Sequence, residues 1–157
     1  MELLYTFLEC SIAILAFASI VAQFKKSKSS QWNLHQYQGI ITHSVQAFFY
    51  SCLPLLLKAF PISENNLWTT CTSVLGIITI LQATGVMFAD KVTKPITKIV
   101  MFSFSFLVLL LQLSHIVGFV NSGIAVYNVG IFWHLFQSIY LIATFILNAE
   151  TDEQIRE

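Results

Sequence analysis

Charged residues are scarce in this sequence. Its 157 residues include 8 lysines and arginines and 8 acidic residues, so charged residues make up 10% of the chain and the formal net charge is +0. A soluble domain carries about 25% charged residues. The scarcity of charge argues against a soluble globule and against a disordered chain. The lack of a net positive charge argues against a nucleic-acid partner.

Cysteine is also rare, and sequence motifs for metal binding or catalysis are lacking. Cys10, Cys52 and Cys71 form no Cys-x-x-Cys pair, which argues against a structural zinc site. The sequence contains no glycine-rich phosphate loop and no nucleophile-elbow motif. We therefore expect the protein not to be an enzyme and to bind no metal.

Hydrophobic residues, by contrast, make up 56% of the chain, and the mean hydropathy is +0.73. A helix needs about 20 mostly apolar residues to cross the ~30 Å hydrocarbon layer of a bilayer. Five windows reach that length, at residues 3–24, 39–60, 67–88, 97–120 and 124–147. The sequence predicts an all-α integral membrane bundle of five transmembrane helices within residues 1–149. Residues 150–157 are expected to form a short acidic cytoplasmic tail.

The lysines predict how this bundle is oriented. Three lysines within residues 25–28 follow the first window, and three more within residues 91–98 surround the third connector. The positive-inside rule places both basic segments in the cytoplasm, with the N-terminus outside and the C-terminus inside. The first window lacks a basic leader region and an obvious cleavage site, so we expect it to be a retained span.

Proline and asparagine mark expected helix boundaries. Pro95 is expected in the first turn of the fourth helix, where no amide donor is needed. Asn65 or Asn66 is available as the N-cap of the third helix. Pro54 lies inside the second window, where it leaves the Tyr50 carbonyl without its helical donor and predicts a kink.

Polar side chains inside the spans are the candidate functional residues. Polar groups in hydrocarbon need partners, so they mark the bundle interior or a water-filled path. With a rise of about 1.5 Å per residue, they fall into three layers, and Glu9 and His115 lie close enough to the outer face to pair. The candidate path residues are Glu9, His43, Gln46, Gln82, Gln112, His115, His134 and Gln137.

These residues allow two interpretations. In the first, they line a track that conducts an ion, a proton or a small solute, with Glu9 as a titratable gate. In the second, they form interhelical hydrogen bonds that fix the helix register, each worth about 0.6–2 kcal/mol. The sequence favours the second interpretation for a single glutamine and leaves both open for Glu9.

Histidines inside the spans also raise the question of a haem. Axial ligands must face each other across one iron at the same depth. His43 is expected near the inner face and His115 near the outer face, about 20 Å apart, while His115 and His134 differ in depth by about 8 Å. Neither pair suits a haem, and a haem-binding electron-transfer subunit is kept as the second alternative.

The first part of the chain carries a resemblance. Residues 13–24 run into a basic loop, and residues 43–57 end in Leu53-Pro54-Leu55-Leu56. In this respect the chain resembles small five-span bacterial inner-membrane proteins of unassigned function. The resemblance implies a location in a bacterial inner membrane and implies no activity.

Taken together, these features favour a small oligomeric membrane channel or transport protein. Its expected partners are the lipid bilayer, further copies of the chain and a small ion. The alternative is a non-conducting interaction or sensory subunit, whose residues 25–38 and acidic tail bind a cytoplasmic protein.

Overall fold

The chain folds into five long helices. The computed structural model describes residues 2–24, 31–89 and 95–154. The α-helices are α1 (Glu2–Phe24), α2 (Gln31–Leu57), α3 (Glu64–Thr84), α4 (Pro95–Ile116) and α5 (Gly123–Gln154), and a short π-helix, η1 (Gly85–Ala89), continues α3. Each α-helix contains a segment long and apolar enough to cross a membrane. The predicted all-α bundle of five candidate spans is confirmed.

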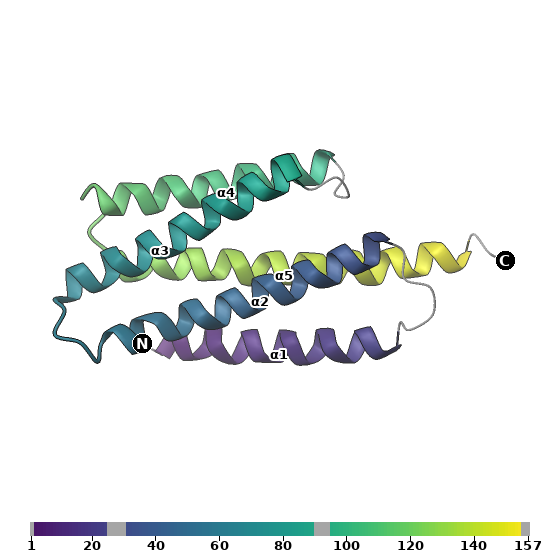
Figure 1. Cartoon of the computed structure of the whole chain (residues 1–157), viewed down its shortest axis with the longest axis horizontal. Helices are drawn as coiled ribbons and strands as arrows, with labels where there is room; N and C mark the ends of the chain where they lie inside the picture. Colours follow the sequence, from purple (N-terminus) through teal and green to yellow (C-terminus); the bar gives the residue numbers. More distant parts are fainter. Residues whose placement is uncertain (1, 25–30, 90–94, 155–157) are drawn as a thin grey trace.

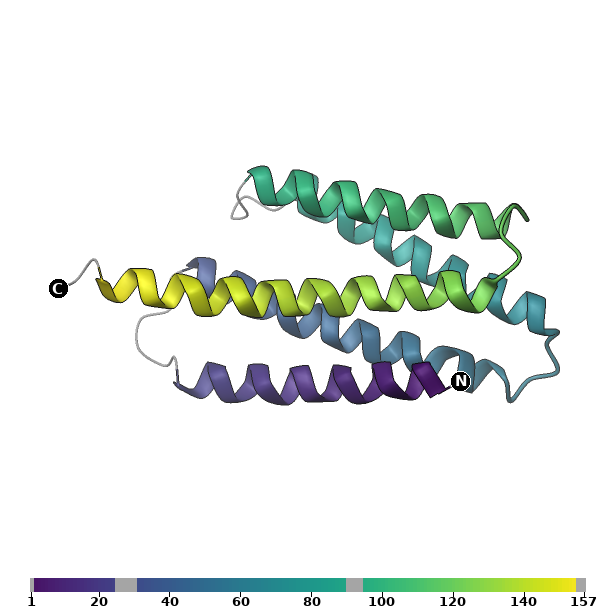
Figure 2. The same ribbon diagram turned by 180° about the vertical axis from the view of Figure 1, so that it is seen from behind.

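Helix α5 is the centre of the bundle (Figures 1 and 2). It packs against each of the other four helices, with α1 and α2 on one side and α3 and α4 on the other. In its most apolar window 50% of the residues are buried, against 22% in α1 and in α4. The outer helices therefore present large apolar side chains outward, as a lipid environment requires.

The bundle has two ends, which we name by one residue each. At the Glu64 end, helices α1, α3 and α5 begin and helices α2 and α4 finish. At the Pro95 end, α1, η1 and α5 finish and α2 and α4 begin. Helices α2 and α5 therefore run antiparallel, while α3 and α5 run in the same direction.

Several helix boundaries differ from the expected ones. Helix α2 begins at Gln31 rather than at residue 39, so residues 31–38 continue the helix beyond its apolar segment. Helix α5 continues to Gln154, so the described part of the expected acidic tail is helical. The N-cap of α3 is Ser63, whose hydroxyl accepts from the Asn66 amide at 3.4 Å, rather than Asn65 or Asn66.

A glycine ends α4 four residues earlier than expected. Gly118 has φ 86°, a left-handed conformation that glycine adopts without a steric cost. The amide of Gly118 donates to the His115 carbonyl at 3.0 Å, and the amide of Phe119 donates to the Ser114 carbonyl at 2.8 Å. This pair of bonds is the Schellman motif, which satisfies the last carbonyls of the helix. The turn fixes His115 at the Glu64 end of the bundle.

Candidate functional site

The contact between α2 and α5 carries paired polar side chains. The Ser44 hydroxyl donates to Ser138 Oγ at 3.0 Å, and both residues are fully buried. Nearer the Pro95 end, Gln36 Nε2 donates to Thr144 Oγ1 at 2.8 Å. Gly39 allows the close approach, because a Cβ atom there would lie 2.7 Å from Cδ1 of Leu141. These bonds fix the register of the two helices.

Two histidines meet in the middle of the same contact. Nδ1 of His43 lies 3.4 Å from Nδ1 of His134, and the ring centroids are 5.7 Å apart. His134 is 1% exposed, and His43 is partly exposed. Counting depth from residue 39 placed His43 near one face of the membrane. The candidate span of α2 begins at Gln36 rather than at residue 39, and in the folded bundle His43 lies level with His134. Residue spacing alone gave no sign of this pair.

The histidine pair does not suit a haem. Axial ligands lie on opposite sides of a porphyrin, which must therefore fit between the two helices. One residue along α2 from His43, the Ser44 and Ser138 hydroxyls are directly hydrogen-bonded. The contact is too close there to admit a porphyrin.

Tyr50 lies about two helical turns further along α2 than His43. Its ring lies 5.2 Å from the ring of His134, centroid to centroid, and its hydroxyl has no hydrogen-bond partner in the described part of the chain. Its backbone carbonyl, which lacks a helical donor because Pro54 has no N–H, accepts from the Tyr127 hydroxyl at 2.7 Å. A tyrosine of α5 thus replaces the missing bond, and α2 continues through Pro54 to Leu57. The kink at Pro54 stays a prediction.

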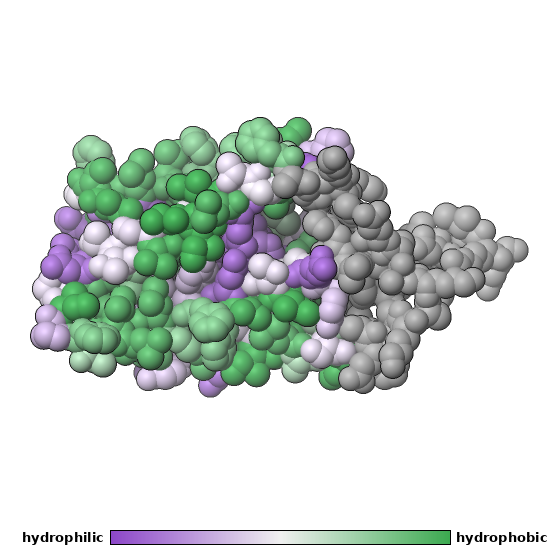
Figure 3. Space-filling view, in the orientation of Figure 1, coloured by the Kyte–Doolittle hydropathy of each residue, from purple (hydrophilic) through white to green (hydrophobic). Residues whose placement is uncertain are grey.

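Helices α2 and α3 are joined by a glutamine pair. Gln82 Nε2 donates to Gln46 Oε1 at 2.5 Å, and both side chains are partly exposed. Hydrophilic side chains gather between the apolar surface over α3 and α4 and the apolar surface over α1 and α2 (Figure 3). Gln137 on α5 is 8% exposed. In the Gln46–Gln82 pair, one amide atom of each side chain is used in the bond to the other.

Gln112 of α4 is held between two glycines. A Cβ atom at Gly76 of α3 would lie 3.0 Å from Oε1 of Gln112, and one at Gly130 of α5 would lie 2.8 Å from Nε2. The Gln112 amide thus occupies the space that two side chains would otherwise fill. Gln112 is 2% exposed, and among the described residues neither amide atom has a hydrogen-bond partner.

His115 lies one helical turn further along α4. Its Nδ1–H donates to the Val120 carbonyl at 2.8 Å, while Nε2 is buried without a partner among residues 2–24, 31–89 and 95–154. Gly123, at the start of α5, leaves room for this ring, because a Cβ atom there would lie 2.6 Å from Nε2. The ring is therefore fixed on one side and has unused hydrogen-bonding capacity on the other.

The expected pairing of Glu9 with His115 does not form. Glu9 is exposed on α1, and α1 makes no contact with α4. These two helices lie on opposite sides of α5 (Figure 1). Matching depth is insufficient for a contact when the two helices are not neighbours in the bundle.

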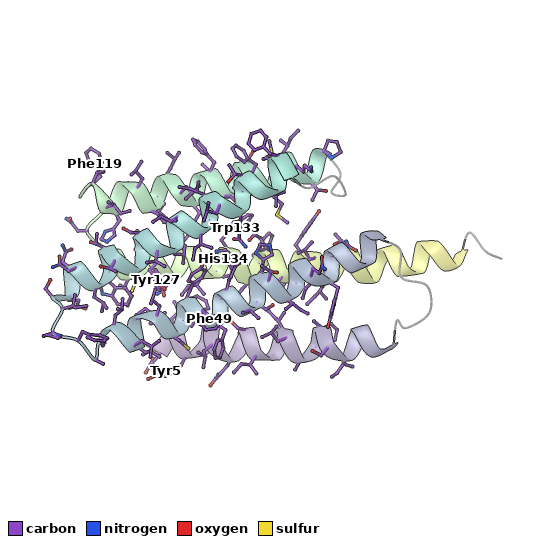
Figure 4. All side chains as sticks on the ribbon, in the orientation of Figure 1. Tyr5, Phe49, Phe119, Tyr127, Trp133 and His134 are labelled. Carbon is purple, nitrogen blue, oxygen red and sulfur yellow. The ribbon has the colours of Figure 1, made fainter. Side chains whose placement is uncertain are left out.

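Seven residues have a buried side-chain N or O atom without a hydrogen-bond partner in the described chain. We call these residues the polar series. They lie on α5 or on the three helices that carry polar side chains to it, and His134 lies on α5 in the middle of the bundle (Figure 4). Three of these residues, Gln112, His115 and His134, were expected path residues. The polar series consists of Gln36, Tyr50, Thr72, Gln112, His115, Asn128 and His134.

A weak signal for two of the missed residues was present in the sequence. Tyr50 follows His43 at a spacing of seven residues, and Thr72 precedes Gly76 by four, so each shares a helix face with a residue at the site. Neither spacing reveals which neighbouring helix that face meets. A metal is not supported by the side chains, because within the described ranges no group of three His, Cys, Asp or Glu residues lies together.

Comparison of the chain with protein-family models, with curated proteins and with solved structures gives no match. The resemblance to small five-span bacterial proteins stays a prediction. The function is therefore argued from the geometry of the polar series.

Proposed function

We propose that the protein is a small membrane channel or transport protein, and that an ion or a small polar solute crosses the bilayer along α5. The observation that carries the proposal is the polar series. Each unsatisfied polar group in a membrane interior costs several kcal/mol. A passing polar species that accepts and donates hydrogen bonds offsets this cost.

The polar series extends along most of the spanning part of α5. At the Glu64 end, His115 Nε2 lies beside Gly123, and the Gln112 amide lies beside Gly130. His134 follows in the middle, and at the Pro95 end Gln36, whose Oε1 is unpartnered, bonds to Thr144. From Gly123 to Thr144, α5 rises about 32 Å at 1.5 Å per residue, which matches the ~30 Å hydrocarbon layer.

Four further candidates lie around the middle of this path. His43 pairs with His134, and the bonded pair Gln46 and Gln82 joins α2 to α3. Gln137 lies within one helical turn of His134 on α5. We place these residues around His134, in the middle of the path.

We also propose that copies of the chain associate through α1. Glu9 is exposed on this helix, inside the candidate span Glu2–Ile20. A carboxyl group in contact with lipid is unfavourable, and a second copy would cover it. Native mass spectrometry from lipid nanodiscs tests this assembly: a dimer or larger oligomer that Glu9→Ala weakens is expected, and a monomer overturns it.

We propose the orientation that the lysines predict, with the N-terminus outside and the C-terminus in the cytoplasm of a bacterial cell. Residues 25–28 and 91–94 lie outside the described residues, but each segment joins two helices at the Pro95 end. A fluorescent protein fused to the C-terminus is expected to mature and fluoresce in bacteria. A periplasmic phosphatase fused there is expected to be inactive, and the opposite result overturns the orientation.

Flux measurements in proteoliposomes test the channel proposal. Vesicles with wild-type protein are loaded with K⁺, Na⁺, H⁺, Cl⁻ or urea in turn, and at least one of these is expected to cross at more than ten times the rate of protein-free vesicles. Gln112→Leu is expected to abolish this flux, because it removes the amide that Gly76 and Gly130 enclose. Gln38→Leu, the same change at an exposed position of α2, is the matched control and keeps the flux.

One result decides against a path through the membrane. If no species tested crosses faster than in protein-free vesicles, the channel proposal is wrong. The non-conducting subunit that binds a cytoplasmic protein then takes its place.

A further inference from the structure

The middle of the proposed path holds three titratable rings in succession. The ring of His43 contacts the ring of His134, and the ring of His134 contacts the ring of Tyr50. The two Nδ1 atoms are 3.4 Å apart, while His134 Nε2 and the Tyr50 hydroxyl have no partner among the residues that the structure describes. Three side chains able to exchange a proton therefore lie next to one another.

We propose that the transported ion is the proton and that His43, His134 and Tyr50 relay it through the middle of the bundle. This inference rests on the proposed function, since it names the species that crosses. Imidazole suits the task because each ring has two nitrogens, one of which accepts a proton while the other donates one.

The relay begins at the partly exposed ring. A proton arriving at Nε2 of His43 makes that ring cationic, and the ring then passes its Nδ1 proton to Nδ1 of His134. His134 is now cationic and releases its Nε2 proton toward the Tyr50 hydroxyl. One proton has crossed two rings, no electrons have moved, and each ring is neutral again with its proton on the other nitrogen.

The last step uses one water molecule. His134 Nε2 and the Tyr50 hydroxyl form no direct hydrogen bond, and a bridging water is enthalpically nearly as good as a direct bond. Tyr50 accepts a proton through this water and gives up its own hydroxyl proton on the far side. To return to its starting tautomer, each ring rotates, releases its proton to water from one nitrogen and takes up a proton from water at the other. No proton passes back along the relay.

The surroundings of the relay favour a proton over a metal ion. In the described residues no carboxylate, cysteine or third histidine joins the histidine pair. A metal ion would therefore meet two neutral nitrogens and no compensating charge, which is unfavourable in a membrane interior. On the Glu64 side, Tyr127 bonds to the Tyr50 carbonyl, and Cys52 and Cys71 lie near Tyr127. Tyrosine and cysteine side chains are ordinarily uncharged at pH 7.

The packing also disfavours a hydrated alkali ion at this level. Ser44 and Ser138 are in direct hydrogen-bond contact beside the histidines, so α2 and α5 leave no gap there for an ion with a water shell. A proton needs no such gap, because it moves along hydrogen bonds between atoms that stay in place.

Two tyrosines provide a matched pair of variants that tests the relay. Tyr50→Phe removes a hydroxyl without a partner, whereas Tyr127→Phe removes a hydroxyl that bonds to the Tyr50 carbonyl. In proteoliposomes with a pH-sensitive dye inside, a K⁺ gradient and valinomycin drive proton entry. Wild-type protein is expected to carry protons, Tyr50→Phe to reduce the rate at least tenfold, and Tyr127→Phe to keep it within twofold.

His43→Gln is the second test and does not depend on the folding of Tyr50→Phe. The substitution replaces a partly exposed ring by an amide that forms hydrogen bonds but cannot pass a proton along the relay. It is also expected to reduce proton entry at least tenfold. Wild-type rates of proton entry in both variants, or in whichever one folds, overturn the relay.

The ion panel separates the relay from the channel proposal. If K⁺, Na⁺, Cl⁻ or urea crosses while protons do not, the relay is wrong and the channel proposal stands. If nothing crosses, both are wrong.

Discussion

The two sides of α5 differ in how far their polar side chains are hydrogen-bonded. Against α2, polar groups are mostly paired, as in the Ser44–Ser138 bond and the Gln36–Thr144 bond. Against α3 and α4, the Gln112 amide is enclosed by glycines and has no partner among described residues. The first contact fixes the helix register with these bonds and leaves single atoms of Gln36, Tyr50 and His134 without a partner in the described chain. The second encloses an amide with no hydrogen bond at either atom. Polar composition alone does not distinguish these two roles.

The largest effect is expected where the glycines enclose Gln112. A Cβ atom at Gly130 would lie 2.6 Å from Leu75 and 2.8 Å from Gln112, both buried. Gly130→Ala is therefore expected to lower the free energy of unfolding by about 1–3 kcal/mol, as overpacked cores do. Unfolding in detergent micelles measures this. Gly85→Ala, where nothing lies within 4 Å, is the control and is expected to be neutral or stabilising.

Gln112→Leu is expected to change stability in the other direction. The buried amide bears a desolvation cost that no hydrogen bond among the described residues offsets, and leucine has a similar size without that cost. The free energy of unfolding should rise by about 1–2 kcal/mol while flux is lost. Thermal unfolding and flux measured on the same preparation test this. A loss of both stability and flux would assign Gln112 to the register of the helices.

The bond from Tyr127 to the Tyr50 carbonyl is expected to contribute about 0.5–1.5 kcal/mol, which Tyr127→Phe removes. A double-mutant cycle tests whether Pro54 is the reason for this bond. Pro54→Ala restores an N–H at position 54 that can bond to the Tyr50 carbonyl along the helix, so Tyr127→Phe should cost less in that background. Equal costs in both backgrounds would show that Pro54 is not the reason for the bond.

The smallest effect is expected for the paired serines. Ser44→Ala should lower the free energy of unfolding by about 0.6 kcal/mol, the average for hydrogen bonds between membrane helices. Its flux should equal that of wild type, because the bond serves the register. A large loss of flux in Ser44→Ala would show that the Ser44–Ser138 bond serves the path as well as the helix register.

The fold was largely predictable because it depends on local features of the chain. The length of an apolar run decides whether a helix can cross a bilayer, and all five runs form such helices. Pro95 begins α4 as its fixed φ angle predicts. The helix ends were less predictable, because they depend on which hydrogen bonds compete there. At the start of α3, Ser63 caps the helix in preference to Asn65 or Asn66.

The candidate site was predictable only in part, since a site depends on which helices are neighbours. The sequence indicated that Gln112 and His134 belong inside the bundle, and both are buried. It gave no sign that Glu9 lies on a helix that never meets His115, nor that His43 reaches His134. Depth along the membrane normal follows from counting residues, whereas position around the bundle does not.

The sequence by itself determined that the chain forms five apolar helices, because helix formation and membrane crossing depend on short stretches of the chain. The tertiary structure alone decided that α5 is the central helix and which of its polar neighbours are paired. It also decided that the Tyr127 hydroxyl bonds to the carbonyl that Pro54 leaves free. The physical reason is that a helix-to-helix contact joins residues far apart in the chain, and its geometry is set by side-chain packing and by glycines that admit close approach.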